Sequence, residues 1–246
     1  DMTGTMSYVG KTIDVMDAET LRSYLTEKIG KDEAINALGN ANTDWQKEIY
    51  RTAFTEELNA SITGSVQGKG KMNSLPYRIS LGHLNQDGIL ETSNMKRSTA
   101  SFNLTPTFFD SHLTVNLNAK GVYAKNRFAD TGAIGAAVSY DPTQEVYDSS
   151  SNGLQGYRIW RNTAGDVNTM ATLNPVAMLN QKDDKSTVKR FIGNAQFDYK
   201  FFYVPGLRAN LNLGLDISSS DGTVDTPEGC EMSWHDKTQN GSGLHK

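Results

Sequence analysis

Residues 207–218 read LRANLNLGLDIS, and apolar and polar side chains alternate along this stretch without a break. Leu, Ala and Ile occupy one parity, whereas Arg, Asn, Gly, Asp and Ser occupy the other. Because side chains on a β-strand point alternately to opposite faces, the stretch predicts a strand with one aliphatic and one polar face. A barrel strand that crosses a membrane needs about 9–11 residues, which this stretch supplies. A long amphipathic strand of a soluble sheet shows the same alternation, so this stretch alone does not decide between the two.

Six further segments share this pattern, and in each of them the second face is rich in Asn, Ser, Thr or Gln. They are residues 2–9, 58–66, 77–82, 100–108, 113–120 and 190–201. Segments of this period predict β-strands, and no long helical pattern lies between them except near the amino terminus. The sequence therefore predicts an all-β fold of about seven strands, joined as an antiparallel up-and-down meander.

The connections between these segments differ in length in a regular way. Tight links are FFDSH at 108–112 and FYVPG at 202–206, and a fairly short basic turn is expected around GlnGlyLysGlyLys at 67–71. The longer links are 11–55, 85–97 and 127–186, followed by the tail after residue 220. Since long and short links alternate along a meander, we expect all long loops at one end. Outer-membrane barrels have this asymmetry.

Aromatic residues gather beside two of the tight links: Phe108, Phe109, Phe201, Phe202 and Tyr203. Aromatic girdles mark the levels at which barrel strands cross the membrane interface. The sequence therefore predicts a partial transmembrane β-barrel with its aliphatic face toward lipid and its polar face toward a lumen. The alternative is a soluble β-sandwich, in which the rings close one end of the core.

One segment inside the first long link has a helical pattern. Asp17 is a good N-cap residue, and apolar side chains follow it at helical spacing up to residue 29. A second short helical segment is expected over residues 32–38. We expect both to be packing elements of the loop.

The composition excludes several function classes. The 246 residues carry a formal net charge of −4, whereas nucleic-acid-binding proteins usually carry a basic patch or stripe. Cys230 is the single cysteine, so no disulfide framework forms within the chain, and the four histidines lack the spacing of metal ligands. No run of 18 apolar residues predicts a membrane-spanning helix. We expect no catalytic, cofactor-binding or metal-ligating residues and no enzyme.

Three passages point to a known family: IDVMDAETLRSYL at 13–25 with TDWQKEIYRTAFTEELNASITG at 43–64, YRISLGHLNQDGILETSNMKRSTASFNL at 77–104, and the span from VNLNAKGVYAKNRF through SYDPTQEVYD to NPVAML at 115–179. In these passages the chain resembles the SusC/RagA-type TonB-linked (TonB-dependent) outer-membrane transporters. The resemblance implies that residues 1–246 are one domain, the first strands of a barrel of about 22 strands. The plug, the TonB box and the amino-terminal domain of the family would lie upstream.

The resemblance also implies a function. The intact transporter would import glycan oligosaccharides or peptides across the bacterial outer membrane, driven by the TonB complex through the absent amino-terminal parts. A SusD-like surface lipoprotein would cover the long loops as a lid. If the fold is the soluble β-sandwich instead, the alternative function is a carbohydrate-binding or adhesin module.

Five aromatic residues of the predicted loops are candidates for contact with substrate or lid: Tyr140, Tyr147, Tyr157, Trp160 and Trp234. Aromatic rings suit the apolar faces of sugars because they offer a flat apolar surface with a polar edge. The same rings also serve to anchor loops, and the sequence favours anchoring.

Overall fold

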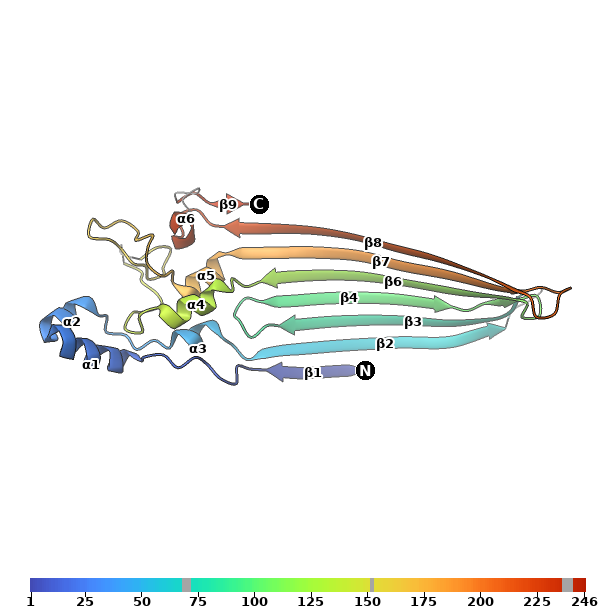
Figure 1. The fold of residues 1–246 in the computed structure, drawn as a ribbon, viewed down its shortest axis with the longest axis horizontal. Helices are drawn as coiled ribbons and strands as arrows, with labels where there is room; N and C mark the ends of the chain where they lie inside the picture. Colours follow the sequence, from blue (N-terminus) through green and yellow to red (C-terminus); the bar gives the residue numbers. More distant parts are fainter. Residues whose placement is uncertain (68–71, 151–152, 236–240) are drawn as a thin grey trace.

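The long strands lie side by side in chain order in this computed structural model, which describes residues 1–67, 72–150, 153–235 and 241–246 (Figure 1). Within these residues, one antiparallel sheet contains nine strands. They are β1 (Met2–Ser7), β2 (Ala53–Gln67), β3 (Met72–Asp87), β4 (Asn94–Leu104), β5 (Thr107–Phe108), β6 (Leu113–Phe128), β7 (Asp183–Lys200), β8 (Arg208–Thr226) and β9 (Leu244–His245). The all-β meander is confirmed. Because the described residues form a single sheet, the β-sandwich alternative is wrong.

The two faces of the sheet stay separate across all long strands. One cross-strand row joins Ile62, Ile79, Phe102, Ala119, Gly193 and Leu215, each directly opposite the next. The row beside it joins Thr63, Arg78, Asn103, Asn118, Asn194 and Gly214 on the other face. We call the first the apolar face and the second the polar face. A register slip of one residue would exchange the two faces, so the hydrophobic pattern fixes the register.

The strand predicted over 100–108 is interrupted near its end. Pro106 lacks an amide hydrogen and cannot donate to the ladder, so β4 stops at Leu104 and β5 begins at Thr107. β5 still pairs with β6 in the register that β4 uses. The two pieces therefore act as one strand with a short break.

The strands extend further toward the loops than the sequence predicts. The link expected over 85–97 is only residues 88–93, because β3 and β4 continue to pair up to Asp87 and Asn94. In this region both faces carry polar side chains, so the alternation disappears while the backbone ladder continues. Arg51 closes the hairpin by donating to the carbonyls of Gly88 at 3.1 Å and Ser93 at 2.7 Å.

Both predicted tight links are confirmed. Phe109, Asp110 and Ser111 have φ values of 53°, 53° and 65°, so three successive residues in the left-handed region reverse the chain between β5 and β6. Gly206, at φ +86°, adopts the same left-handed backbone conformation between β7 and β8, and a residue with a Cβ is disfavoured there. The basic turn expected at 67–71 lies almost wholly outside the described residues.

The helices lie at the end of the sheet opposite these tight turns (Figure 1). They are α1 (Ala18–Ile29), α2 (Lys31–Ala37), α3 (Trp45–Ile49), α4 (Gly132–Ser139), α5 (Pro175–Gln181) and α6 (Glu231–His235). The two helices predicted in the first long loop are confirmed as α1 and α2, and the side chain of Asp17 caps α1 by accepting from the Thr20 amide at 2.7 Å. None of the described helices combines the length and apolarity needed to cross a membrane.

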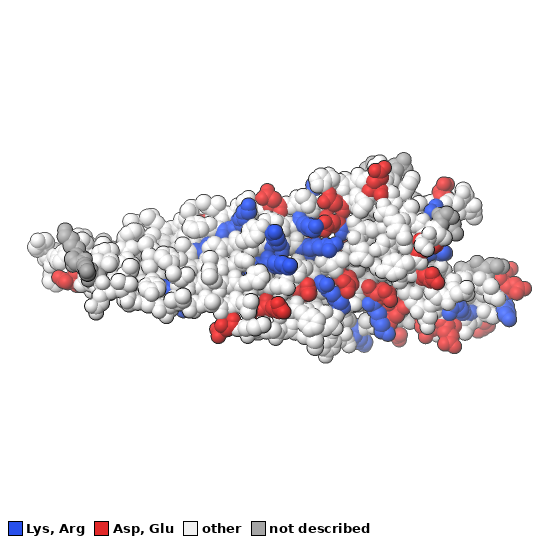
Figure 2. All heavy atoms as spheres, turned by 180° about the vertical axis from the view of Figure 1, so that it is seen from behind, with Lys and Arg blue, Asp and Glu red and all other residues white. Residues whose placement is uncertain are grey.

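Charged side chains are distributed unevenly along the sheet. In Figure 2, the half of the molecule nearest the tight turns shows few of them, whereas Lys, Arg, Asp and Glu gather over the half nearest the loops. The face seen in Figure 2 therefore has a largely uncharged section toward the tight turns and a charged section toward the loops.

Candidate functional site

The connections at the loop end form a packed layer, which we call the loop layer: residues 8–52, 88–93, 129–150, 153–182, 227–235 and 241–243. Its buried core draws side chains from α3, α4, α5 and the intervening loops. The members of this core are Trp45, Ile49, Leu90, Ala133, Ala136, Ala137, Tyr140, Val146, Val176, Met178 and Leu179. Three alanines of α4 allow the neighbouring helices to approach closely. The long loops are therefore held by a hydrophobic core of their own.

Three aromatic rings lie in contact within this layer. The rings of Trp45 and Tyr140 have their centroids 4.4 Å apart, and those of Tyr140 and Trp160 are 5.8 Å apart. The Trp45 indole N–H donates to the carbonyl of Asp141 at 2.9 Å, which satisfies its one polar atom. Asp44 caps α3 by accepting from the Lys47 amide at 3.2 Å and so fixes the position of Trp45.

Beside these rings lies a hollow of about 1040 Å³. It is lined by residues 12–17, Leu21, residues 42–47, residues 137–142, Trp160 and residues 171–172. Four carboxylates, of Asp14, Asp17, Asp44 and Asp141, and one lysine, Lys47, are among the lining residues. The hollow thus combines aromatic surface with an acidic border, a composition suited to a polar, uncharged or cationic ligand.

The acidic groups at this border are partly engaged by the fold. The Thr20 amide and hydroxyl hold the pKa of Asp17 below its usual value. Asp141 accepts from the amide and the hydroxyl of Thr143, at 2.8 and 2.7 Å. Burial raises the pKa of Tyr140, and the charge of Glu231 adds to that rise. Tyr140 therefore stays neutral at physiological pH.

The structure places all five predicted aromatic residues in the loop layer, but not at one point. Tyr140 and Trp160 line the hollow, and Tyr140 is only 4% exposed. Tyr147 and Tyr157 form a separate pair with ring centroids 5.4 Å apart, in which Tyr147 is 59% exposed. Trp234 lies on α6 and is 38% exposed.

Sequence reasoning missed a buried polar pair, Asn174 and Glu231. The Asn174 amide donates to the Glu231 carboxylate at 2.9 Å, and its side-chain amide donates to the carbonyls of Val146 at 2.9 Å and Arg158 at 3.0 Å. Burial raises the pKa of Glu231 to about 7. The dipeptide Asn174-Pro175 was a visible helix-start signal, because Asn is a good N-cap and Pro suits the first helical position.

The polar face of the sheet is a second candidate surface. Arg190 pairs with Asp216 on it, with Nε and Oδ1 2.9 Å apart, and Asn194 donates to Asn212 at 2.8 Å. A hollow of about 780 Å³ lies on its β2–β6 part, with Arg78 and Lys120 among its lining residues. Among the described residues, no group of three His, Cys, Asp or Glu side chains is arranged to hold a metal ion.

Comparisons with known proteins identify relatives of the chain. It is 40% identical to the TonB-dependent receptor SusC of Bacteroides thetaiotaomicron over 235 residues, which are 89% of this chain and 22% of that receptor. It is 27% identical to the TonB-dependent receptor P3 of Formosa agariphila over 229 residues, 89% of this chain and 20% of that receptor. The chain thus spans about a fifth of the length of these relatives. No protein-family model matches it.

Solved structures share the fold. The structure of the RagAB peptide transporter matches 97% of this chain and 29% of its own, with a TM-score of 0.68 and 17% identity. The RagAB peptide importer in its closed-closed state matches 92% of this chain and 28% of its own, with a TM-score of 0.61 and 17% identity. The meander of the long strands therefore corresponds to part of the fold of those proteins.

Proposed function

Because the chain belongs to the SusC/RagA-type TonB-dependent receptors, we propose that residues 1–246 form one domain, a section of barrel wall in a transporter of the bacterial outer membrane. The observation that carries this proposal is the separation of the sheet into two faces that persist over six long strands. Such a sheet suits a wall between lipid and water. Because the matched proteins are named as a receptor and a transporter, we propose that this protein transports a solute and does not catalyse a reaction.

The dimensions of the apolar face support a lipid-facing role. From Leu207, the residue before β8, it extends to Ile217 within β8, ten residue steps or about 33 Å at the usual strand rise. With the tilt of about 40° that barrel strands adopt, this length spans about 25 Å along the membrane normal, the usual height of the apolar band. Leu211, Leu213 and Leu215 are each more than half exposed, which is costly in water and favourable in lipid.

The polar face supports the role of a lumen wall. Asn, Ser, Thr, Gln and charged side chains cover it, and all of these carry hydrogen-bond donors or acceptors. Sugars and peptide backbones are both rich in hydrogen-bonding groups. We therefore propose glycan oligosaccharides or peptides as the transported class, and the name of the RagAB peptide importer favours the inclusion of peptides.

The loop layer supports the proposed partners. In this proposal a SusD-like surface lipoprotein covers the loop layer, and the exposed rings of Tyr147 and Trp234, together with Trp160 at the hollow, contact substrate or lid. The TonB complex supplies energy through parts of the protein outside these 246 residues. Tyr140 and Tyr157 then serve mainly to hold the rings in place.

Uptake by living cells tests the proposal. The gene for the natural full-length protein is deleted, and radiolabelled oligosaccharides and peptides are offered to the mutant and to the parent strain. We expect the mutant to lose uptake of at least one such class, and the wild-type gene but not a Leu213→Arg version to restore it. Unchanged uptake of all offered substrates, with the protein recovered in the soluble fraction of the parent, would contradict the proposal.

A further inference from the structure

Near the loop end, the side chains of the apolar face change from apolar to polar and charged within two successive cross-strand rows. Its last apolar row joins Ala60, Leu81, Ala100, Gly121, Phe191 and Ile217. The next row joins Leu58, His83, Ser98, Tyr123, Lys189 and Ser219. The row after that joins Glu56, Asn85, Lys96, Lys125, Thr187 and Asp221. Toward the tight turns this surface is apolar, and toward the loops it is cationic. The same change of polarity separates the acyl chains of an anionic lipid from its headgroup.

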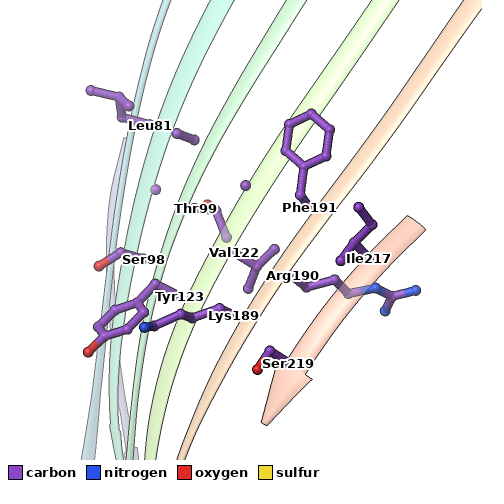
Figure 3. Close-up of a pocket in the computed structure, with 13 residues that line it drawn as sticks. Leu81, Ser98, Thr99, Val122, Tyr123, Lys189, Arg190, Phe191, Ile217 and Ser219 are labelled. Atoms are coloured by element: carbon purple, nitrogen blue, oxygen red, sulfur yellow. The ribbon is translucent and has the colours of Figure 1, made fainter. Parts of the chain in front are cut away.

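A hollow of about 640 Å³ lies at this boundary, and Gly121, which has no side chain, is one of the residues that line it. Gly121 leaves open space, because a Cβ built there would meet nothing within 4 Å. Figure 3 shows Leu81 on one side of the hollow and Phe191 with Ile217 on the other, while Tyr123 and Lys189 lie toward the loop end. The hollow is therefore walled by apolar groups and bordered by a cation.

Three lysines above the hollow lack an acidic partner. Lys96, Lys125 and Lys189 are exposed, and among the described residues none of them forms an ion pair. Lys96 stands directly opposite Lys125, an arrangement of like charges that destabilises a sheet unless an anion lies between them. The Lys125 ammonium lies 5.7 Å from the Tyr123 ring centroid, so it extends toward the hollow side of its strand.

The nearest acidic groups on this face do not neutralise these lysines. Glu56 stands two strands away from Lys96, or about 10 Å at the usual strand spacing. Asp87 and Asp221 are closer, as diagonal neighbours of Lys96 and Lys189 on the adjacent strands. Asp87 pairs instead with Arg51 at 3.4 Å, and among the described residues no ion pair joins Asp221 to Lys189. Asp183 is engaged by Arg127 at 3.4 Å and by Lys185 at 2.5 Å. Among the described residues, Lys96, Lys125 and Lys189 thus remain without an ion pair on the loop side of the hollow.

We propose that this surface binds a lipid with a phosphate headgroup. The phosphate lies among Lys96, Lys125 and Lys189, and an acyl chain fills the hollow at Gly121. Phosphate oxygens accept charge-assisted hydrogen bonds from lysine ammonium groups, and long lysine stems lie along apolar surface while their charged ends reach the headgroup level. The inference rests on the proposed function in one respect, namely that the apolar face is turned toward lipid.

The test uses the natural full-length protein that contains this chain, purified in neutral detergent. Native mass spectrometry measures retention of dioleoyl phosphatidic acid and of zwitterionic dioleoyl phosphatidylcholine. We expect retention of phosphatidic acid at a concentration about tenfold lower than phosphatidylcholine. Millimolar inorganic phosphate should not displace the lipid, because the acyl chain in the hollow contributes to binding; displacement by phosphate alone would overturn the lipid assignment.

Matched variants distinguish the contribution of the three lysines from that of the hollow at Gly121. The triple variant Lys96→Ala, Lys125→Ala and Lys189→Ala should lose the preference for phosphatidic acid, whereas Lys120→Ala, on the polar face of the same strand β6, should keep it. Gly121→Leu should weaken retention of both lipids by filling the hollow. Its control is Gly214→Leu, on the polar face of β8, where a Cβ also meets nothing within 4 Å.

Heat-modifiable migration on gels first confirms that each variant is an assembled barrel. If the triple variant does not assemble, the single change Lys125→Gln, which removes the charge next to the hollow, replaces it and should halve the preference or more. Equal retention of the two lipids by assembled wild-type protein overturns this inference and leaves the proposed function standing. Wild-type protein that does not assemble as a barrel overturns both.

Discussion

Asn194 donates a hydrogen bond to Asn212 at 2.8 Å on the polar face of the sheet, while the next residue of β8, Leu213, stands opposite Ala195 on the apolar face. Two adjacent positions of one strand thus belong to different surroundings. In the proposed barrel, one of these side chains faces the lumen and the other faces lipid. Substitutions at the two positions therefore show whether an effect on assembly depends on the face that a side chain occupies, because both positions lie in the same part of β8.

Leu213→Arg is expected to reduce barrel assembly in the natural full-length protein far more than Asn212→Arg. An arginine on the lipid face near the bilayer midplane costs about 2–4 kcal/mol, whereas an arginine in a watery lumen remains hydrated. Heat-modifiable migration of outer-membrane fractions measures the assembled share. Equal tolerance at the two positions would show that the apolar face does not meet lipid.

The loop layer should pack more weakly as pH rises, because of Glu231. Burial raises the pKa of this carboxyl from an ordinary value of 4.5 to about 7. A raised folded-state pKa means that its contribution to stability is complete below pH 4.5 and is lost as pH rises through about 7. The full effect is on the order of 3 kcal/mol. Hydrogen exchange of the α5 amides should therefore be slower at pH 5 than at pH 8 after correction for the intrinsic rates.

Glu231→Gln should remove this pH dependence, whereas Glu228→Gln, at an exposed position of the same segment, should keep it. Burial lowers the pKa of His235, which destabilises the packed layer at low pH and so opposes the effect of Glu231. Since His235 is present in both variants, their difference isolates the carboxyl. Protection of α5 that increases from pH 5 to pH 8 in the wild type would contradict the assignment.

The predicted aromatic residues should separate into two groups when changed to alanine. Tyr140→Ala removes a ring packed against Trp45 and Trp160, and large-to-small changes of this kind cost about 3–5 kcal/mol in a core. It should loosen the loop layer, measured as increased protease cleavage between residues 129 and 182. Tyr147→Ala and Trp234→Ala should leave cleavage unchanged and lower substrate uptake or lid binding. Unchanged uptake in both would make these rings anchors only.

A protease site inserted beside Ser150 should be cut on intact cells. The insertion lies in the loop layer, which is at the outer end of the strands in the proposed barrel, and Ser149 and Ser150 are exposed. The same site inserted at Asp110, in the tight turn between β5 and β6, should be cut only after the outer membrane is permeabilised. Cleavage in the reverse order would place the loop layer in the periplasm.

The central parts of the strands could be predicted from sequence because each has one apolar and one polar face, as in 207–218. Their outer parts could not, because Asn85, Lys96 and Lys125 make the apolar face polar above the last apolar row, and the pairing there depends on the backbone ladder. The five-residue helices α3 and α6 are too short for a periodic pattern. The aromatic candidates were visible, whereas the Asn174–Glu231 pair was not, since 57 residues separate its members.

The 246-residue chain expressed alone is expected to aggregate. β1 leaves one edge of the described sheet unpaired, and most of the outer edge of β8 is open because β9 pairs only with Asp225 and Thr226. Exposed edges pair with other chains, and an apolar face without lipid drives association. Size-exclusion chromatography and a thermal melt in detergent-free buffer should show large species without a cooperative transition. A monodisperse monomer with a sharp melt would mean that the apolar face is covered within the chain itself, and the lipid-facing assignment would have to be abandoned.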